Sequence, residues 1–214
     1  MRLLLPRLYV ILDAGLSSEP PTEMARKLIG AGVEVLQYRA KNVPAREMLA
    51  SARELAGVAR GAGARFFVNG RPDVAYLAEA HGVHVGQDDL GVEEARAVVG
   101  PHAWVGLSTH SVEQFEKALR SSADYIALGP IFATTSKANP DPVVGLELIR
   151  RARRLTERPI VAIGGITLER AAGVIEAGAD SVAVINDILR VEDPVARVRD
   201  YLRRLEAAES AANH

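Results

Sequence analysis

The chain has 214 residues, of which 48% are hydrophobic and 25% are charged, and its formal net charge is -1. This composition is typical of a globular protein, and the length suits one large domain or two small ones. The near-neutral charge argues against a general role in binding nucleic acids or membrane surfaces. Because the chain has no cysteine, disulfides, thiol catalysis and thiolate metal sites are excluded. The apolar N-terminal segment is too short for a transmembrane helix and lacks the cleavage pattern of a signal peptide, which predicts a soluble, cytoplasmic protein.

Short β-rich runs alternate with longer segments that carry apolar residues at helical spacing. The predicted strands are residues 8–12, 35–39, 66–69, 82–85, 104–108, 125–128, 160–163 and 182–185. Helical patterns between them include residues 45–62 and 111–120, and the expected helix starts are Ser111, Thr167 and Asp193. The Ala-rich tail, residues 206–214, is expected to fray.

This alternation predicts an α/β protein built as a single, compact (β/α)8 TIM barrel over residues 1–214, because βαβ alternation forces parallel pairing of the strands. An open, doubly wound sheet is the alternative. However, the stretch "LDAGLSSEP" after the first strand does not match the glycine-rich GxGxxG turn of that fold. No low-complexity linker divides the chain.

Polar residues gather where the predicted strands end, and in TIM barrels the chemistry lies at the C-terminal ends of the strands. Gln37, Arg39 and Lys41 follow each other at every second position, which on a strand directs all three to one face. Two cations at the end of a buried strand need an anion, and phosphate is the favoured candidate. An internal salt bridge to an Asp or a Glu is the alternative.

Four further strand ends suggest phosphate and metal binding. The loop "ATTSKANPDP" after the sixth strand offers the hydroxyls of Thr134, Thr135 and Ser136 and the ammonium group of Lys137, and it also fits a mobile lid. Backbone N–H groups near Gly165, Ile185 and Asn186 favour a second phosphate site. Asp89 could then hold Mg²⁺ together with substrate phosphates, although Asp88 or Asp89 could instead cap the following helix.

Seven motifs occur in order along nearly the whole chain: "QYRAK", "VNGRPDVA", "GVHVGQDD", "GLSTHS", "GPIFATTSK", "VVGLE" and "AIGGI". Together they resemble the family of thiamine phosphate synthase and of the TenI-type thiazole tautomerase. The synthase joins hydroxymethylpyrimidine diphosphate to a thiazole phosphate and releases pyrophosphate in thiamine biosynthesis. By resemblance, the pyrimidine diphosphate is bound by Gln37, Arg39, Lys41, Asn69, Ser108 and Lys137. The residues implied for the thiazole phosphate are Thr134, Thr135, Ser136, Gly165, Ile185 and Asn186.

The family mechanism is dissociative. Diphosphate leaves first, and the thiazole nitrogen captures the resulting pyrimidine-stabilised carbocation. The resemblance therefore implies that Arg39, Lys41, Lys137 and a Mg²⁺ ion on Asp89 neutralise the charge that grows on the leaving group. The partners expected are small phosphorylated molecules, and the sequence leaves a homo-oligomer open.

One position departs from the synthase pattern. The family reads Asn-Asp-Arg with the Asp as a metal ligand, whereas this chain reads Asn69-Gly70-Arg71. Tautomerases can carry Asn-Gly-Arg here, and their general base corresponds to His110. Because the chain keeps Lys41 and Asp89, we expect the synthase, with weakened metal affinity. The tautomerase and a non-catalytic binding or regulatory relative remain alternatives. His84 is expected to be a core histidine with satisfied hydrogen bonds.

Overall fold

The computed structural model of the chain describes residues 3–134 and 141–212. Within these residues the strands are β1 Leu8–Asp13, β2 Val35–Arg39, β3 Arg65–Asn69, β4 Gly82–Val85, β5 Trp104–Thr109, β6 Tyr125–Leu128, β7 Ile160–Ile163 and β8 Ser181–Val184. The helices are α1 Pro21–Gly30, α2 Ala45–Gly61, α3 Pro72–Leu77, α4 Val92–Val99, α5 Val112–Ala118, α6 Gly145–Leu155, α7 Leu168–Glu176, α8 Asn186–Leu189 and α9 Pro194–Ala212. Each predicted strand boundary lies within one residue of the observed one.

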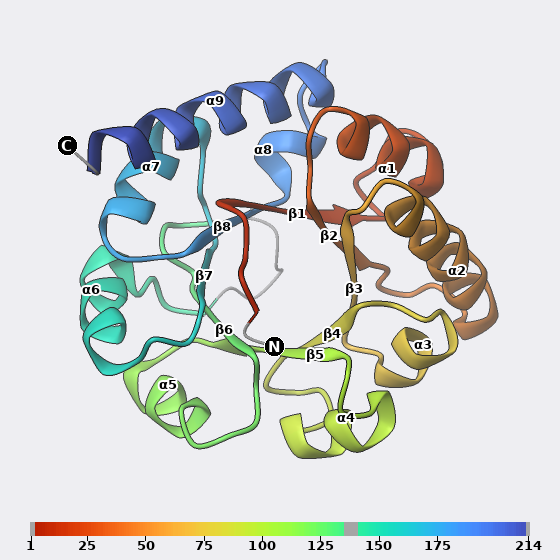
Figure 1. The fold of residues 1–214 in the computed structure, drawn as a ribbon, viewed down its shortest axis with the longest axis horizontal. Helices are drawn as coiled ribbons and strands as arrows, with labels where there is room; N and C mark the ends of the chain where they lie inside the picture. The colour runs from red at the N-terminus through yellow and green to blue at the C-terminus, as the bar shows by residue number, and fades with distance from the viewer. Residues whose placement is uncertain (1–2, 135–140, 213–214) are drawn as a thin grey trace.

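The eight strands form a closed parallel barrel, which confirms the predicted fold. Each strand pairs with the next one in the chain, and β1 closes the barrel by pairing with β8. The helices surround the strands as an outer ring (Figure 1). Because all strands are parallel, their C-terminal ends meet at one end of the barrel, and this end is called the mouth below.

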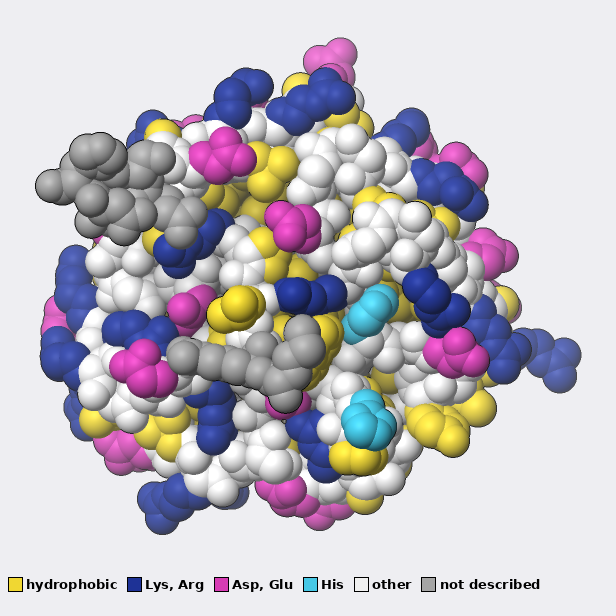
Figure 2. Space-filling model, in the orientation of Figure 1, with side chains coloured by type: hydrophobic (Ala, Val, Ile, Leu, Met, Phe, Trp, Pro, Cys, Tyr) yellow, Lys and Arg dark blue, Asp and Glu magenta, His cyan; other side chains and the backbone are white. Residues whose placement is uncertain are grey.

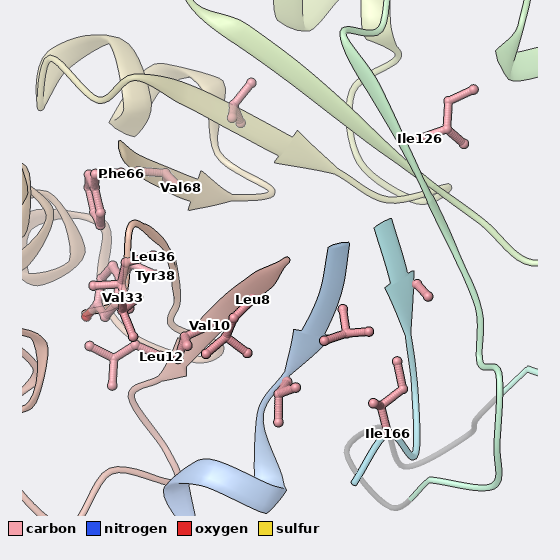
Figure 3. Packing of buried hydrophobic residues seen from close by; sticks show 14 of the residues in the cluster. Leu8, Val10, Leu12, Val33, Leu36, Tyr38, Phe66, Val68, Ile126 and Ile166 are labelled. Carbon is pink, nitrogen blue, oxygen red and sulfur yellow. The ribbon is translucent and has the colours of Figure 1, made fainter. Parts of the chain in front are cut away.

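Two hydrophobic clusters hold the barrel together, and the period-2 alternation of the strands sorts residues between them. Leu8, Val10 and Leu12 of β1 belong to the larger cluster, between the barrel and the helices (Figure 3). The smaller cluster fills the barrel interior and contains Tyr9 and Ile11 of the same strand. Leu3 also joins the interior cluster, so the N-terminal segment closes the end of the barrel opposite the mouth.

The helix ends test several sequence predictions. Ser111 caps α5, since its hydroxyl accepts a hydrogen bond from the Gln114 backbone N–H at 3.2 Å. Asp193 caps α9 through the Ala196 backbone N–H at 2.9 Å. Thr167 precedes α7 as predicted but makes no side-chain bond to the helix backbone. α9 continues to Ala212, and the fraying of residues 206–214 stays a prediction.

The described residues on the face seen in Figure 2 carry no strong charge of one sign. Figure 2 shows acidic and basic side chains interspersed around that face, in agreement with the near-neutral net charge. Among the described residues, no helix is long and apolar enough to span a membrane.

Candidate active site

The mouth brings together most of the predicted site residues. Gln37 and Arg39 lie at the end of β2, Asn69 ends β3, and Ser108 lies one residue before the end of β5. Asp89 follows β4, Gly165 follows β7 and Asn186 follows β8. A groove of about 600 Å³ between α1 and α2 lies near the other end of the barrel, beside Val33, Glu34 and Ala64, and is not part of this site.

Arg39 has an acidic partner that the strand-end reasoning overlooked. Asp13, the last residue of β1, pairs with Arg39 in the β1–β2 register, and its carboxylate accepts a hydrogen bond from the Arg39 guanidinium. The Asp13 side chain is 8% exposed and that of Arg39 is 17% exposed, so the ion pair is largely removed from water. The alternative of an internal salt bridge therefore holds for Arg39 in the free protein. A bound diphosphate would therefore contact an Arg39 guanidinium that is already paired with Asp13.

Lys41 differs from the strand-face prediction. β2 ends at Arg39, so Lys41 lies in the following turn and is exposed. Of the three residues predicted to share one strand face, only Gln37 and Arg39 lie on the strand. Lys41 stands at the rim, where a flexible side chain can approach an anion from the solvent side.

Six polar side chains form a continuous hydrogen-bonded chain through the barrel interior. We call it the polar chain, and in order it consists of Asn69, Gln37, Tyr9, Tyr125, His84 and Ser108. The Asn69 amide nitrogen donates to Gln37 Oε1 at 3.1 Å, and Gln37 Nε2 donates to the Tyr9 hydroxyl at 2.9 Å. The Tyr9 and Tyr125 hydroxyls are 2.9 Å apart. Each polar group thereby gains the partner that burial demands.

The second half of the polar chain runs through His84. Its Nδ1 lies 2.9 Å from the Tyr125 hydroxyl, and its Nε2 lies 2.8 Å from Ser108 Oγ. This confirms the expectation of a core histidine with both nitrogens satisfied. Burial, assisted by the nearby His110, lowers the pKa of His84 to about 4, so the ring is neutral near pH 7. Burial also raises the pKa of both Tyr9 and Tyr125.

Space for Tyr125 is provided by a glycine on the neighbouring strand. A Cβ atom added to Gly106 of β5 would lie 2.0 Å from Tyr125 Cζ and 2.4 Å from its hydroxyl oxygen. Gly106 and Tyr125 pair in the β5–β6 register, so the glycine lets the phenol ring cross the barrel interior. The glycine of the "GLSTHS" motif is thus a packing requirement of the polar chain.

Asp89 lies directly beside Gly70, the position at which the sequence departs from the synthase pattern. A Cβ atom on Gly70 would be 3.1 Å from Asp89 Oδ1 and 3.3 Å from Oδ2. Asp89 is exposed, and its Oδ2 accepts a hydrogen bond from the Gly86 backbone N–H at 2.7 Å. The capping alternative is wrong for this helix start, because α4 begins after Gly91 without a side-chain cap.

The turn after β7 is formed by two consecutive glycines. Gly164 and Gly165 have φ angles of 98° and 63°, a region that favours glycine. The loop after β6 packs onto this turn, since the Phe132 backbone N–H donates to the Gly164 carbonyl at 3.0 Å. Beyond β8, Asn186 Oδ1 is buried and lacks a hydrogen-bond partner among the described residues.

His110, the residue implied as base in the tautomerase alternative, has a defined ring orientation. Its Nδ1 lies 2.6 Å from the Gly129 carbonyl oxygen, which can only accept, so Nδ1 carries the hydrogen. Nε2 lies 3.7 Å from Asp141 Oδ2. His110 therefore connects β5 to the loop after β6.

The structure describes the predicted phosphate loop in part. Thr134 is described and partly buried, whereas Thr135, Ser136 and Lys137 lie outside the described residues. Conversely, the structure adds Asp13, Tyr9 and Tyr125, which were not predicted. The signal that was available is the alternation in "LYVILD", which directs Tyr9 and Asp13 to the interior face that Gln37 and Arg39 also occupy.

Comparison with known proteins identifies the family. The family model described as thiamine monophosphate synthase matches residues 8–188. The chain belongs to this family. The thiamine-phosphate synthase of Koribacter versatilis is 52% identical over 208 residues, covering 95% of this chain and 97% of the relative. That of Chloroflexus aurantiacus is 43% identical over 207 residues, covering 96% of this chain and 95% of the relative.

A solved structure agrees with the membership in this transferase family. The thiamine phosphate pyrophosphorylase from Pyrococcus furiosus superposes with a TM-score of 0.86 at 34% identity, over 94% of this chain and 96% of that chain. The resemblance inferred from the seven motifs is thereby confirmed at the level of the family and of the barrel.

Proposed function

We propose that this protein is a thiamine-phosphate synthase, which joins hydroxymethylpyrimidine diphosphate to a thiazole phosphate and releases pyrophosphate. The observation that carries the proposal is the largely buried guanidinium of Arg39, which lies on the same strand as Gln37 and is held at the mouth by Asp13 of the neighbouring strand. A cation beside fixed amide groups suits a ligand that joins a diphosphate to a polar ring. Family membership supports the same reaction.

In this reaction the C–O bond between the pyrimidine methylene and the diphosphate breaks, and the electron pair leaves with the diphosphate oxygen. The thiazole nitrogen then supplies the pair for the new C–N bond. Arg39 and Lys41, with Lys137 from the loop after β6, would neutralise the charge that grows on the departing oxygen. Interactions that strengthen as that charge develops are the ones that lower the barrier.

The residues beside Gly70 fit a magnesium ion of modest affinity. Asp89 is exposed at the rim, and its Oδ1 is not used in the hydrogen bond to Gly86. Mg²⁺ is commonly bound by one or two carboxylates with substrate phosphates and water filling the other positions. When bound, Mg²⁺ would add positive charge against the diphosphate. Within the described residues no group of three acidic or histidine side chains gathers as a metal site, so the substrate would have to supply ligands.

The thiazole phosphate would bind at the opposite side of the mouth. There Thr134, Gly165, Ile185 and Asn186 surround the ends of β6, β7 and β8, with Thr135 and Ser136 in the loop that is not described. Backbone N–H groups at glycine turns can approach phosphate oxygens closely. Placing the two substrates on opposite sides directs the thiazole nitrogen toward the pyrimidine methylene. A cytoplasmic location and a homo-oligomer stay predictions.

The proposal is tested by supplying both substrates and Mg²⁺ to the purified chain and measuring pyrophosphate together with thiamine phosphate. We expect Arg39→Gln to lower kcat/KM by about 100-fold, the size typical for loss of a group that stabilises developing charge. Lys27→Met on α1 is the control, because Lys27 pairs with Glu19 on the outer surface. Absence of pyrophosphate release by the unaltered chain under these conditions would refute the proposal.

A thiazole tautomerase is the second candidate, favoured by the geometry of His110. With hydrogen on Nδ1, the neutral ring offers the Nε2 lone pair as a base. His110→Asn is informative, because its amide nitrogen can keep the bond to the Gly129 carbonyl while the Nε2 position is lost. A synthase should tolerate this change better than His110→Ala. A tautomerase should lose isomerisation in both variants and release no pyrophosphate.

A further inference from the structure

We propose that the polar chain is a one-way hydrogen-bond relay in which Tyr125 and His84 hold Ser108 as a hydrogen-bond donor toward the mouth. Tyr125 and His84 act in it as positioning residues, since they reach the mouth only through Ser108. The direction of the relay is a property of the free protein. Its use in recognising the pyrimidine substrate rests on the proposed function.

The direction begins at Gln37, whose amide has one acceptor and one donating end. Asn69 donates to Gln37 Oε1, so Nε2 is the end that faces Tyr9 and donates to it. The Tyr9 oxygen is then an acceptor, and its own hydrogen is left for Tyr125 at 2.9 Å. Tyr125 accepts from Tyr9 and passes its hydrogen to His84 Nδ1 at 2.9 Å.

His84 transfers this direction to Ser108. A neutral imidazole carries one hydrogen, and because Nδ1 accepts from Tyr125, that hydrogen must be on Nε2. Burial keeps the ring neutral near pH 7 by lowering the pKa of His84 to about 4. Nε2 therefore donates to Ser108 Oγ at 2.8 Å, and the Ser108 hydrogen remains available for a ligand.

The two ends of the relay are consequently complementary. Asn69 uses its amide nitrogen on Gln37 and leaves Oδ1 as an acceptor, while Ser108 is left as a donor. The two residues lie on either side of His84, because Asn69 pairs with His84 across β3 and β4 and Ser108 of β5 lies 2.8 Å from His84 Nε2. A ring that presents a donor toward Asn69 and an acceptor toward Ser108 would match both.

If the Gln37 amide were turned over, every bond in the relay would reverse. Ser108 would donate to His84, and Asn69 would present its amino group instead of its carbonyl. Both directions satisfy the buried groups, so a purely structural role would be indifferent to the choice. Ligand recognition does depend on the direction. A ring that suits one direction would, in the other, place its donor against the Asn69 amino group and its acceptor against the Ser108 oxygen.

The tautomer of His84 reports the direction, and Gln37→Glu should reverse it. A carboxylate only accepts, so Tyr9 would have to donate to it, Tyr125 to Tyr9, and His84 Nδ1 to Tyr125. We expect the hydrogen of His84 to move from Nε2 in the unaltered chain to Nδ1 in Gln37→Glu. The measurement is ¹⁵N NMR of the full chain with labelled histidine, with the signal assigned by its loss in His84→Gln.

The His84 tautomer is measured without substrate. The pH is kept high enough for the Glu introduced at position 37 to be ionised, which the ¹³C chemical shift of its carboxyl group reports. Two results would overturn the proposal. One is a His84 hydrogen on Nδ1 in the unaltered chain, and the other is a His84 tautomer that is the same in Gln37→Glu as in the unaltered chain. Tyr125→Phe tests the route, because it cuts the relay between the two ends. With Tyr125→Phe present, the change at Gln37 should no longer move the tautomer, and a tautomer that still moves would also overturn it.

Tyr38→Phe is the matched control, since Tyr38 is buried on β2 but faces the helices in the outer cluster. It should leave the His84 tautomer unchanged. In the coupling assay, Tyr125→Phe should raise KM for the pyrimidine diphosphate by about fivefold to tenfold, the size of one lost hydrogen bond, with KM for the thiazole phosphate unchanged. An equal rise in both KM values would contradict positioning. Lack of coupling by the unaltered chain would instead refute the proposed function and leave the tautomer result intact.

Discussion

The two sides of the barrel interior differ in the kind of side chain that fills them. From β1 to β6 the interior carries the polar chain, whose side chains fix one another by hydrogen bonds of 2.8 to 3.1 Å. On β7 and β8 the interior side chains are mostly apolar, namely Val161, Ile163 and Ala183, and the buried Ser181 hydroxyl donates to the Arg7 carbonyl rather than to the polar chain. The first side should respond to single-atom exchanges of equal volume, and the second to added volume.

The largest effect is expected on the side of β7 and β8, from Gly165→Val. A Cβ atom there would lie 2.3 Å from the Ala133 carbonyl oxygen and 2.8 Å from Phe132 Cβ, in a backbone with φ of 63°. The left-handed backbone costs about 1–2 kcal/mol and the overlap about 1–3 kcal/mol, so we expect a loss of about 2–5 kcal/mol in urea unfolding. Gly173→Val in α7, where no atom of the described residues lies within 4 Å of the added Cβ, should change stability by less than about 1 kcal/mol.

The same substitution tests how the thiazole phosphate is held. If backbone N–H groups are the donors, Gly165→Val should weaken phosphate binding more than Asn186→Ala, measured by calorimetry under conditions where both variants are folded. Because the added side chain also displaces the loop after β6, Gly165→Ala is a useful milder comparison. Equal losses in the Asn186 and Gly165 variants would contradict a backbone site.

The second effect belongs to the polar side and depends on pH. The pKa of His84 falls from an ordinary 6.5 to about 4 on folding, because burial disfavours the charged ring. The contribution of neutral His84 to the free energy of unfolding is complete above pH 6.5. It is lost as the pH falls toward 4, because the histidine of the unfolded chain takes up a proton at a higher pH than that of the folded chain. At about 1.4 kcal/mol per pKa unit, this amounts to about 3 kcal/mol.

The measurement compares urea unfolding of the unaltered chain with His84→Gln between pH 7.5 and 4. Other groups that titrate in this range, such as His81, contribute to both proteins and cancel in the difference. The advantage of the unaltered chain should shrink by about 3 kcal/mol across the range. A difference that stays constant with pH would show that His84 titrates normally in the folded protein.

The contrast between the two sides also explains what could be predicted from the sequence. The strands and their polar ends follow from alternation and position, so Arg39, Asn69 and Ser108 could be assigned to the mouth. Asp13 was missed because its pairing with Arg39 depends on the register between neighbouring strands. The bond between Tyr9 and Tyr125 joins residues 116 positions apart across the barrel, and no local pattern encodes such a contact.

The smallest effect is expected at the rim, where Gly70→Asp would restore the second carboxylate of the family pattern. Its Cβ would lie 3.1 Å from Asp89 Oδ1, so the two carboxylates would be neighbours. Gly70 has φ of 70°, a region that Asp and Asn enter more readily than most residues, and the expected cost is about 1 kcal/mol. Gly70→Asn is the matched control, because it carries the same backbone strain and nearly the same volume without the charge.

Mg²⁺ should separate the two variants. Without the ion, the new carboxylate and Asp89 repel each other, so Gly70→Asp should be the less stable variant. With Mg²⁺ and inorganic pyrophosphate, the repulsion becomes attraction to the cation, and the Tm of Gly70→Asp should rise more than that of Gly70→Asn. The Mg²⁺ concentration for half-maximal coupling should fall by about fivefold, equivalent to about 1 kcal/mol, with thiazole phosphate affinity unchanged. If both variants responded to Mg²⁺ alike, Asp89 would not be at the metal position, and the glycine would mark a site that works through Arg39 and the lysines alone.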